Sequence, residues 1–96
     1  MSDISTIIEK LKSAKPSLSA KYNINNLAVF GSYSRNEQNA ESDIDIMVEF
    51  SKPIGLEFVS LAFELEQLLG TKVDLVSKKA IKKGYLNYIL KDIKYV

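Results

Sequence analysis

The pattern that most constrains this chain is a helical stripe of apolar residues set between two short strand-like runs. Apolar residues recur at helical spacing over 56–69, and Gly70 follows where a helix cap is expected. A run of alternating polarity over 43–50 precedes the stripe, and an apolar run over 72–76 follows it. A helix between two strands favours a sheet with helices packed on it.

The N-terminal part of the chain carries a second helical stripe. Isoleucine and leucine at i, i+3, i+4 and i+7 over 4–11 predict a helix, which Pro16 interrupts before a short second helix over 17–22. The asparagines within 23–26 predict a turn after it. This region is therefore predicted to be helical up to the turn.

The remaining segments alternate between apolar and polar. An apolar run over 27–30 predicts a buried strand. The polar segment 31–42 predicts a loop with a helical turn near 34–38. A helix over 85–90 and an extended segment over 93–96 are predicted near the C-terminal end.

The order of these segments predicts an α+β fold, in which helices cover a small mixed sheet of three to four strands. The composition supports a single globular domain over 1–96, since 46% of the residues are hydrophobic and 26% are charged. We see no signal peptide and no apolar run long enough to span a bilayer, and so expect a soluble cytoplasmic protein. A net charge of +1 argues against a polyanion-binding surface, so nucleic acid is not expected as a direct partner.

The absence of histidine and cysteine limits the chemistry that the chain can perform. Without these residues there is no Ser-His or Cys-His nucleophile and no imidazole or thiolate metal site. Any bound metal must therefore have oxygen ligands, which favours Mg²⁺, Mn²⁺ or Ca²⁺.

A glycine-serine pair and three carboxylates are the candidate functional residues. Gly31 and Ser32 follow the buried strand, where backbone amides and a hydroxyl can face an anion; the alternative is an ordinary turn. Asp43 and Asp45 are two residues apart in a strand, so their carboxylates share a face and can hold a cation; the alternative is a solvated acidic strand end. Asp74, between apolar residues of another strand, can complete a three-carboxylate cluster or can be a surface or lysine-paired residue.

Basic and aromatic residues add further candidates. Arg35 is the only arginine among 13 basic residues and follows Gly31 closely, which suits bidentate phosphate binding; the alternative is a solvated loop charge. Four lysines within 78–83 can bind phosphate or RNA, or form a solvated helix face. The tyrosines of the C-terminal segment, Tyr85, Tyr88 and Tyr95, can contact a partner or pack in the core.

The spacing of these residues resembles the signature of the minimal nucleotidyltransferases of the DNA polymerase β superfamily. The resemblance is carried by residues 28–50 (AVFGSYSRNEQNAESDIDIMVEF), with Val73-Asp74-Leu75 as a third part, and nearly the whole chain fits that family's minimal length. One departure is Asn36, where many members have glycine after the arginine. Asparagine tolerates left-handed backbone better than most residues, so we expect the loop to form.

The resemblance implies a role for each candidate residue. Gly31, Ser32 and Arg35 would bind a nucleoside triphosphate, and Asp43 and Asp45 with Asp74 would ligate Mg²⁺ at one or two sites. Asp74 would also assist deprotonation of the attacking hydroxyl. The implied reaction is AMP transfer from ATP with release of pyrophosphate.

The resemblance also implies a partner. Minimal enzymes of this size typically pair with a HEPN-family toxin, adding AMP to a tyrosine hydroxyl of the toxin as the antitoxin of a type VII toxin–antitoxin system. A hetero-oligomer with the toxin as acceptor is therefore our first hypothesis. The alternatives are a subunit that modifies a small molecule such as an aminoglycoside with a companion acceptor-binding protein, and a non-catalytic antitoxin binding module.

Overall fold

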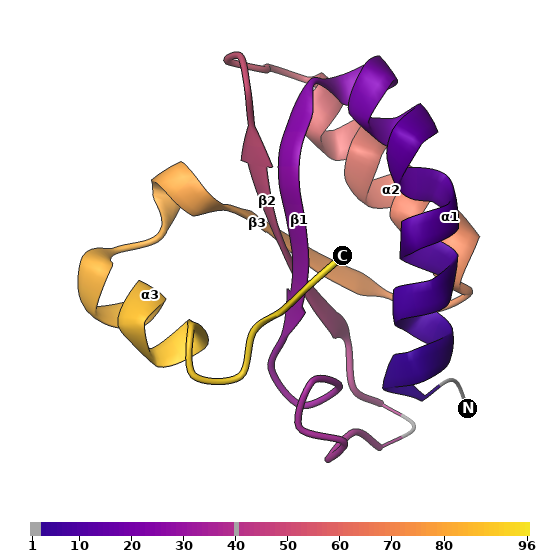
Figure 1. Cartoon of the computed structure of the whole chain (residues 1–96), viewed down its shortest axis with the longest axis vertical. Helices are drawn as coiled ribbons and strands as arrows, with labels where there is room; N and C mark the ends of the chain where they lie inside the picture. The colour runs from indigo at the N-terminus through magenta and orange to yellow at the C-terminus, as the bar shows by residue number, and fades with distance from the viewer. Residues whose placement is uncertain (1–2, 40) are drawn as a thin grey trace.

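The computed structural model describes residues 3–39 and 41–96, and within them it shows a mixed α+β fold. Helices α1 (Ile4–Tyr22) and α2 (Glu57–Leu69) lie side by side on one face of a sheet, and α3 (Lys83–Ile89) lies on the other side (Figure 1). This arrangement confirms the fold class predicted from the sequence. The elements follow in the order α1 (Ile4–Tyr22), β1 (Ile24–Phe30), β2 (Ile44–Phe50), α2 (Glu57–Leu69), β3 (Val73–Ser77), the short 3₁₀ helix η1 (Lys78–Ala80), α3 (Lys83–Ile89) and β4 (Lys94–Tyr95).

The four strands that the structure describes form one mixed sheet in the order β3-β2-β1-β4. Strand β1 pairs antiparallel with both β2 and β4. Strand β2 pairs parallel with β3, and α2 supplies the crossover between them. The sheet therefore brings the N-terminal ends of β2 and β3 together with the C-terminal end of β1.

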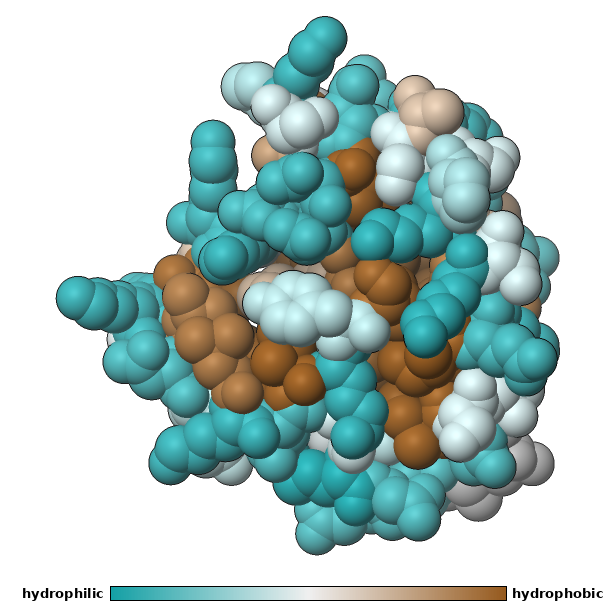
Figure 2. Space-filling view, in the orientation of Figure 1, coloured by the Kyte–Doolittle hydropathy of each residue, from teal (hydrophilic) through white to brown (hydrophobic). Residues whose placement is uncertain are grey.

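Alternation along the strands divides the apolar residues between the two faces of the sheet. The larger core lies against α1 and α2, and the smaller one packs Ala28, Phe30 and Met47 against Ile89 of α3. Figure 2 shows apolar residues gathered around α3 on the left of the view, between hydrophilic side chains. Asp45 is two residues from Met47, so it lies on the α3 side. The larger core includes Ile7, Leu11, Leu27, Val29, Ile44, Ile46, Val48, Leu61 and Leu65.

The predicted interruption at Pro16 is wrong, because α1 continues through this residue to Tyr22. Pro16 is exposed, while Leu11, Leu18 and Tyr22 are buried along one stripe. The stripe keeps its phase on both sides of the proline, so packing on the sheet offsets the backbone hydrogen bond that proline cannot donate.

The predicted asparagine turn is also shorter than expected. Asn23 caps α1 in the left-handed conformation with φ of 57°, but β1 already begins at Ile24. The Asn26 side-chain amide donates a 2.7 Å hydrogen bond to Glu49 on β2, so this polar residue belongs to the sheet. Elsewhere the element boundaries differ from the predicted ones by one to three residues, and Gly70 caps α2 with φ of 70° as predicted.

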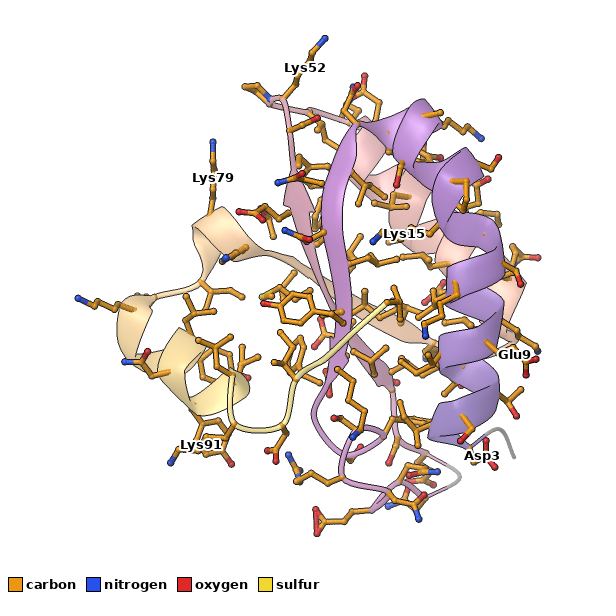
Figure 3. The ribbon with its side chains drawn as sticks, in the orientation of Figure 1. Asp3, Glu9, Lys15, Lys52, Lys79 and Lys91 are labelled. Atoms are coloured by element: carbon orange, nitrogen blue, oxygen red, sulfur yellow. The ribbon has the colours of Figure 1, made fainter. Side chains whose placement is uncertain are left out.

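The C-terminal end of the chain is held against α1. The Lys15 ammonium donates a 2.7 Å hydrogen bond to the carbonyl of Val96, and Figure 3 shows this side chain directed across the sheet. Through residues 3–39 and 41–96, the structure has no helix that is both long and apolar enough to cross a membrane.

Candidate functional site

Asp45 and Asp74 lie beside each other at the start of two parallel strands. They are register partners in the β2–β3 ladder, and Asp45 faces Phe30 of β1 on its other side. Asp45 is half-buried, whereas Asp74 is exposed because β3 is the edge strand. The strand register meets the condition under which Asp74 could join the β2 carboxylates, and its exposure on an edge strand is also what the alternative interpretation of this residue described.

The surroundings of Asp45 disfavour its charged form. The pKa of Asp45 is raised to about 6, mainly by burial and also by the charge and hydrogen bonding of Asp74 and the charge of Asp43, while Arg35 acts in the opposite direction. Asp43 itself is exposed and lies just before β2. Burial and the neighbouring carboxylates therefore both disfavour the ionised form of Asp45.

Gly31 provides the space that the Asp45 carboxylate occupies. Its backbone has φ of 77°, a conformation that favours glycine, and a Cβ added there would lie 2.2 Å from Asp45 Oδ2. A side chain at position 31 would therefore displace the carboxylate. The glycine of the predicted phosphate loop thus also fixes where the acidic residue stands.

The loop after Gly31 is a tight turn held by its own backbone. The Arg35 amide donates to the Gly31 carbonyl at 3.2 Å, and the Glu37 amide donates to the Ser32 carbonyl at 2.8 Å. Tyr33 is buried in the larger core and anchors the turn. Amides at the start of such a turn have no carbonyl one turn earlier to bind, so those that follow Gly31 are suited to an anion.

Asn36 occupies a left-handed position in this loop, with φ of 58°. Glycine adopts this conformation without steric cost, and asparagine is among the other residues that adopt it most readily. The expectation that the loop forms despite Asn36 is therefore confirmed.

Arg35 is engaged by two carboxylates. Its Nε donates to Glu37 at 2.5 Å and its Nη1 donates to Asp92 at 3.3 Å. These contacts raise the pKa of Arg35, the hydrogen bond to Glu37 most strongly. The Ser34 hydroxyl donates to the Asp92 carbonyl, so the loop is tied to the segment after α3. A phosphate bound by Arg35 must compete with these two acidic partners.

A cleft of about 270 Å³ lies between the loop after Gly31 and α3. Four of the predicted site residues line the cleft, namely Gly31, Ser32, Arg35 and Asp45. Asp74 does not line it but is the strand neighbour of Asp45, and Asp43 lies just before β2 and does not line it either. Asp92 was not among the predicted site residues, and no local pattern marks it. The lining residues are Phe30, Gly31, Ser32, Arg35, Asp45, Tyr85, Tyr88, Ile89 and Asp92.

The lysine run lies away from this cleft. It begins after β3, at the opposite end of that strand from Asp74. Lys78 approaches Glu49 at 3.8 Å, and Lys79 points away from the sheet (Figure 3). This placement favours the interpretation of the run as a solvated surface.

The carboxylates of Asp43, Asp45 and Asp74 are of the chemical type that binds a divalent cation. Within the parts of the chain that the structure describes, no three acidic side chains converge into a formed metal centre. Asp45 and Asp74 nevertheless offer oxygen ligands in register, and Asp43 is close enough to raise the pKa of Asp45. Oxygen ligands of this kind are those that Mg²⁺ and Mn²⁺ prefer, and a cation would relieve the repulsion between the carboxylates.

Replacement of Asp45 by asparagine is expected to stabilise the protein in the absence of metal. The folded pKa of about 6 exceeds the ordinary 3.8, so the wild type loses stability as the pH rises through this range. Asparagine does not ionise, so it avoids this loss. After allowance for solvent screening, Asp45→Asn should raise the free energy of unfolding at pH 7.5 by on the order of 1 kcal/mol, which corresponds to about 4–8 °C in Tm. The difference should disappear near pH 4.

Thermal unfolding of both proteins in EDTA at pH 7.5 and pH 4 measures this effect. Comparison at each pH cancels the titration of the other acidic residues, which both proteins share. A variant that is less stable than the wild type at pH 7.5 would show that Asp45 has a structural role.

The sequence profile of the nucleotidyltransferase domain matches residues 5–96. The chain therefore belongs to the nucleotidyltransferase domain family. A Methanocaldococcus jannaschii relative that carries the provisional name protein adenylyltransferase is 49% identical over the full length of both chains. Protein adenylyltransferase MntA of Thermococcus cleftensis is 41% identical over 93% of this chain and 92% of its own.

Solved structures show the same similarity. A structure described as a minimal nucleotidyltransferase is 30% identical, with a TM-score of 0.82 over 97% of this chain and 95% of that chain. A toxin–antitoxin complex with AMP-PNP contains a chain that is 26% identical, with a TM-score of 0.71 over 98% of this chain and 72% of that chain. A complex of a tri-AMPylated HEPN toxin with its MNT antitoxin from Shewanella oneidensis matches with 25% identity and a TM-score of 0.61, over 96% of this chain and 66% of that chain.

Proposed function

We propose that this chain transfers AMP from ATP to a tyrosine hydroxyl of a HEPN-family toxin, as the antitoxin of a type VII toxin–antitoxin system. The observation that carries the proposal is the Asp45–Asp74 pair, held in strand register beside the Gly31 backbone. The relative named protein adenylyltransferase and the solved complex with an AMPylated toxin support the acceptor class.

In this proposal the loop after Gly31 binds the triphosphate. Its first amides and the Ser32 hydroxyl donate to phosphate oxygens, and Arg35 adds a positive charge at the edge of the cleft. Asp43, Asp45 and Asp74 would together hold Mg²⁺, at one or two sites, and the bound cation would neutralise charge on the phosphates. Gly31 keeps the Asp45 carboxylate within the cleft.

The acceptor oxygen forms a bond to the α-phosphorus as the bond from that phosphorus to the bridging oxygen breaks. Pyrophosphate leaves, and the hydroxyl proton passes to the carboxylate of Asp74. Asp74 is exposed on the edge strand, so a hydroxyl on a second protein can reach it. The acceptor protein would therefore bind this chain in a hetero-oligomer. We propose that the functional unit contains one catalytic domain over 1–96 and acts in the cytoplasm.

Incubation with labelled ATP, Mg²⁺ and the product of the neighbouring gene tests this function. Label in the α-phosphate should pass to the partner protein and label in the γ-phosphate should not, which separates nucleotidyl transfer from phosphorylation. Transfer to an added aminoglycoside instead of the protein would favour a small-molecule enzyme. Association with the partner without any transfer would favour a binding module.

Removal of the divalent cation is expected to stop the transfer. Oxygen ligands alone are available, so EDTA should abolish label incorporation, and added Mg²⁺ or Mn²⁺ should restore it. A zinc-selective chelator serves as the control and should have no effect. Full transfer in EDTA would reject the metal role of the three carboxylates.

A further inference from the structure

Two tyrosines of α3 are exposed beside the proposed catalytic residues. Tyr85 and Tyr88 are 55% and 60% exposed, whereas Ile89 of the same helix is buried. Their rings are nearly parallel, with an interplanar angle of 10° and centroids 6.3 Å apart. This exposure is inconsistent with packing in the core, which was one of the two interpretations that the sequence allowed.

Both tyrosines line the cleft that contains Gly31, Ser32 and Asp45. The two sides of this cleft differ in character. The loop and strand side carries hydrogen-bond donors, Arg35 and the Asp45 carboxylate that would hold the cation, and the α3 side carries the two aromatic rings. A nucleoside triphosphate has the same division, because its phosphates are anionic and its base is a flat aromatic ring.

We propose that Tyr85 and Tyr88 bind the nucleobase of the substrate by stacking, while the loop after Gly31 binds the phosphates. This inference rests on the proposed nucleotidyltransferase function and assigns the part of the substrate that α3 recognises. Stacking of a base on an aromatic side chain changes the dissociation constant by about five- to a hundredfold. Tyr85 also borders an apolar hollow of about 490 Å³ that includes Phe58, Val76 and Ile81, so the ring has an apolar wall beside it.

The proposal predicts that removing the rings weakens binding of ATP but leaves binding of tripolyphosphate unchanged. The paired substitution Tyr85→Ala and Tyr88→Ala should raise the dissociation constant for ATP at least about tenfold in the presence of Mg²⁺. Tripolyphosphate has no base and should bind both proteins equally. Phenylalanine at both positions keeps the rings and should retain ATP affinity within about threefold.

Calorimetry with the intact chain measures both ligands, and tyrosine fluorescence gives a second readout because the chain has five tyrosines and no tryptophan. Stacking of adenine should quench the fluorescence of the wild type, and tripolyphosphate should not. Tyr95→Ala is the matched control, because Tyr95 is 49% exposed on β4 and does not line the cleft. This variant should bind ATP as the wild type does.

Equal ATP affinity in the wild type and the double alanine variant, with folded protein by circular dichroism, would overturn the nucleobase assignment alone. If that variant instead lost only its association with the partner protein, the two rings would belong to a docking surface and the assignment would also be wrong. A wild-type chain that binds tripolyphosphate and ATP equally would reject base recognition. A chain that binds neither would reject the proposed function as well.

Discussion

Gly31→Ala is expected to lower AMP transfer by at least about a hundredfold while the protein remains folded. The added methyl group would lie 2.2 Å from Asp45 Oδ2, so the Asp45 side chain must rotate away from its place in the cleft. Displacing a catalytic group by about 1 Å can cost a hundredfold in rate. The backbone at φ of 77° adds a strain of about 1–2 kcal/mol, which is small enough for the fold to survive.

Gly70→Ala is the matched control for this experiment. Gly70 has a similar φ of 70°, but nothing lies within 4 Å of an added Cβ. Both variants should therefore lose about the same amount in Tm, while only Gly31→Ala loses transfer. Similar transfer rates in the two variants would show that the position of Asp45 against Gly31 is unimportant for the reaction.

Asp45→Asn is expected to reduce transfer by at least about a thousandfold, although it stabilises the fold at neutral pH. The substitution replaces a charged oxygen ligand, and charge stabilisation in the transition state by a bound cation contributes several kcal/mol. Steady-state transfer of labelled AMP, measured over a range of Mg²⁺ concentrations, detects this loss. Opposite changes in stability and activity are what we expect of a site in which the carboxylates repel each other until a cation binds.

Glu41→Gln provides a control that removes a nearby acidic group outside the proposed site. Glu41 is exposed in the loop before β2 and does not line the cleft. It should leave transfer within about twofold. Comparable losses in Asp45→Asn and Glu41→Gln would indicate a general electrostatic effect in place of a specific role for Asp45.

Much of the fold follows from local patterns in the sequence. The α2 stripe with its Gly70 cap, the strands on either side of it and the mixed sheet were all predicted, because spacing and caps act within a few residues. The continuation of α1 through Pro16 was not predicted. It depends on burial of Leu18 and Tyr22 against residues distant in the sequence, which a local rule does not include.

In the candidate site, too, the features set by local patterns were predictable and those set by long-range contacts were not. The strand patterns around Asp45 and Asp74 allowed their carboxylates to meet if the two strands were neighbours, and the observed register places the two residues side by side. The Asp92 contacts and the aromatic side of the cleft could not be predicted. They form only when the segment after α3 returns to the sheet, and Asp92 is 57 positions from Arg35 in the sequence.

Protein adenylyltransferase activity is tested most directly by intact-mass measurement of the partner HEPN-family protein after incubation with this chain, ATP and Mg²⁺. We expect a gain of one or more whole AMP units on the partner, and no gain with Asp45→Asn. Replacement of the modified tyrosine by phenylalanine should remove the gain at that residue. An unchanged partner mass, with wild-type chain that is folded and bound to the partner, would contradict the proposal that this chain is a protein adenylyltransferase.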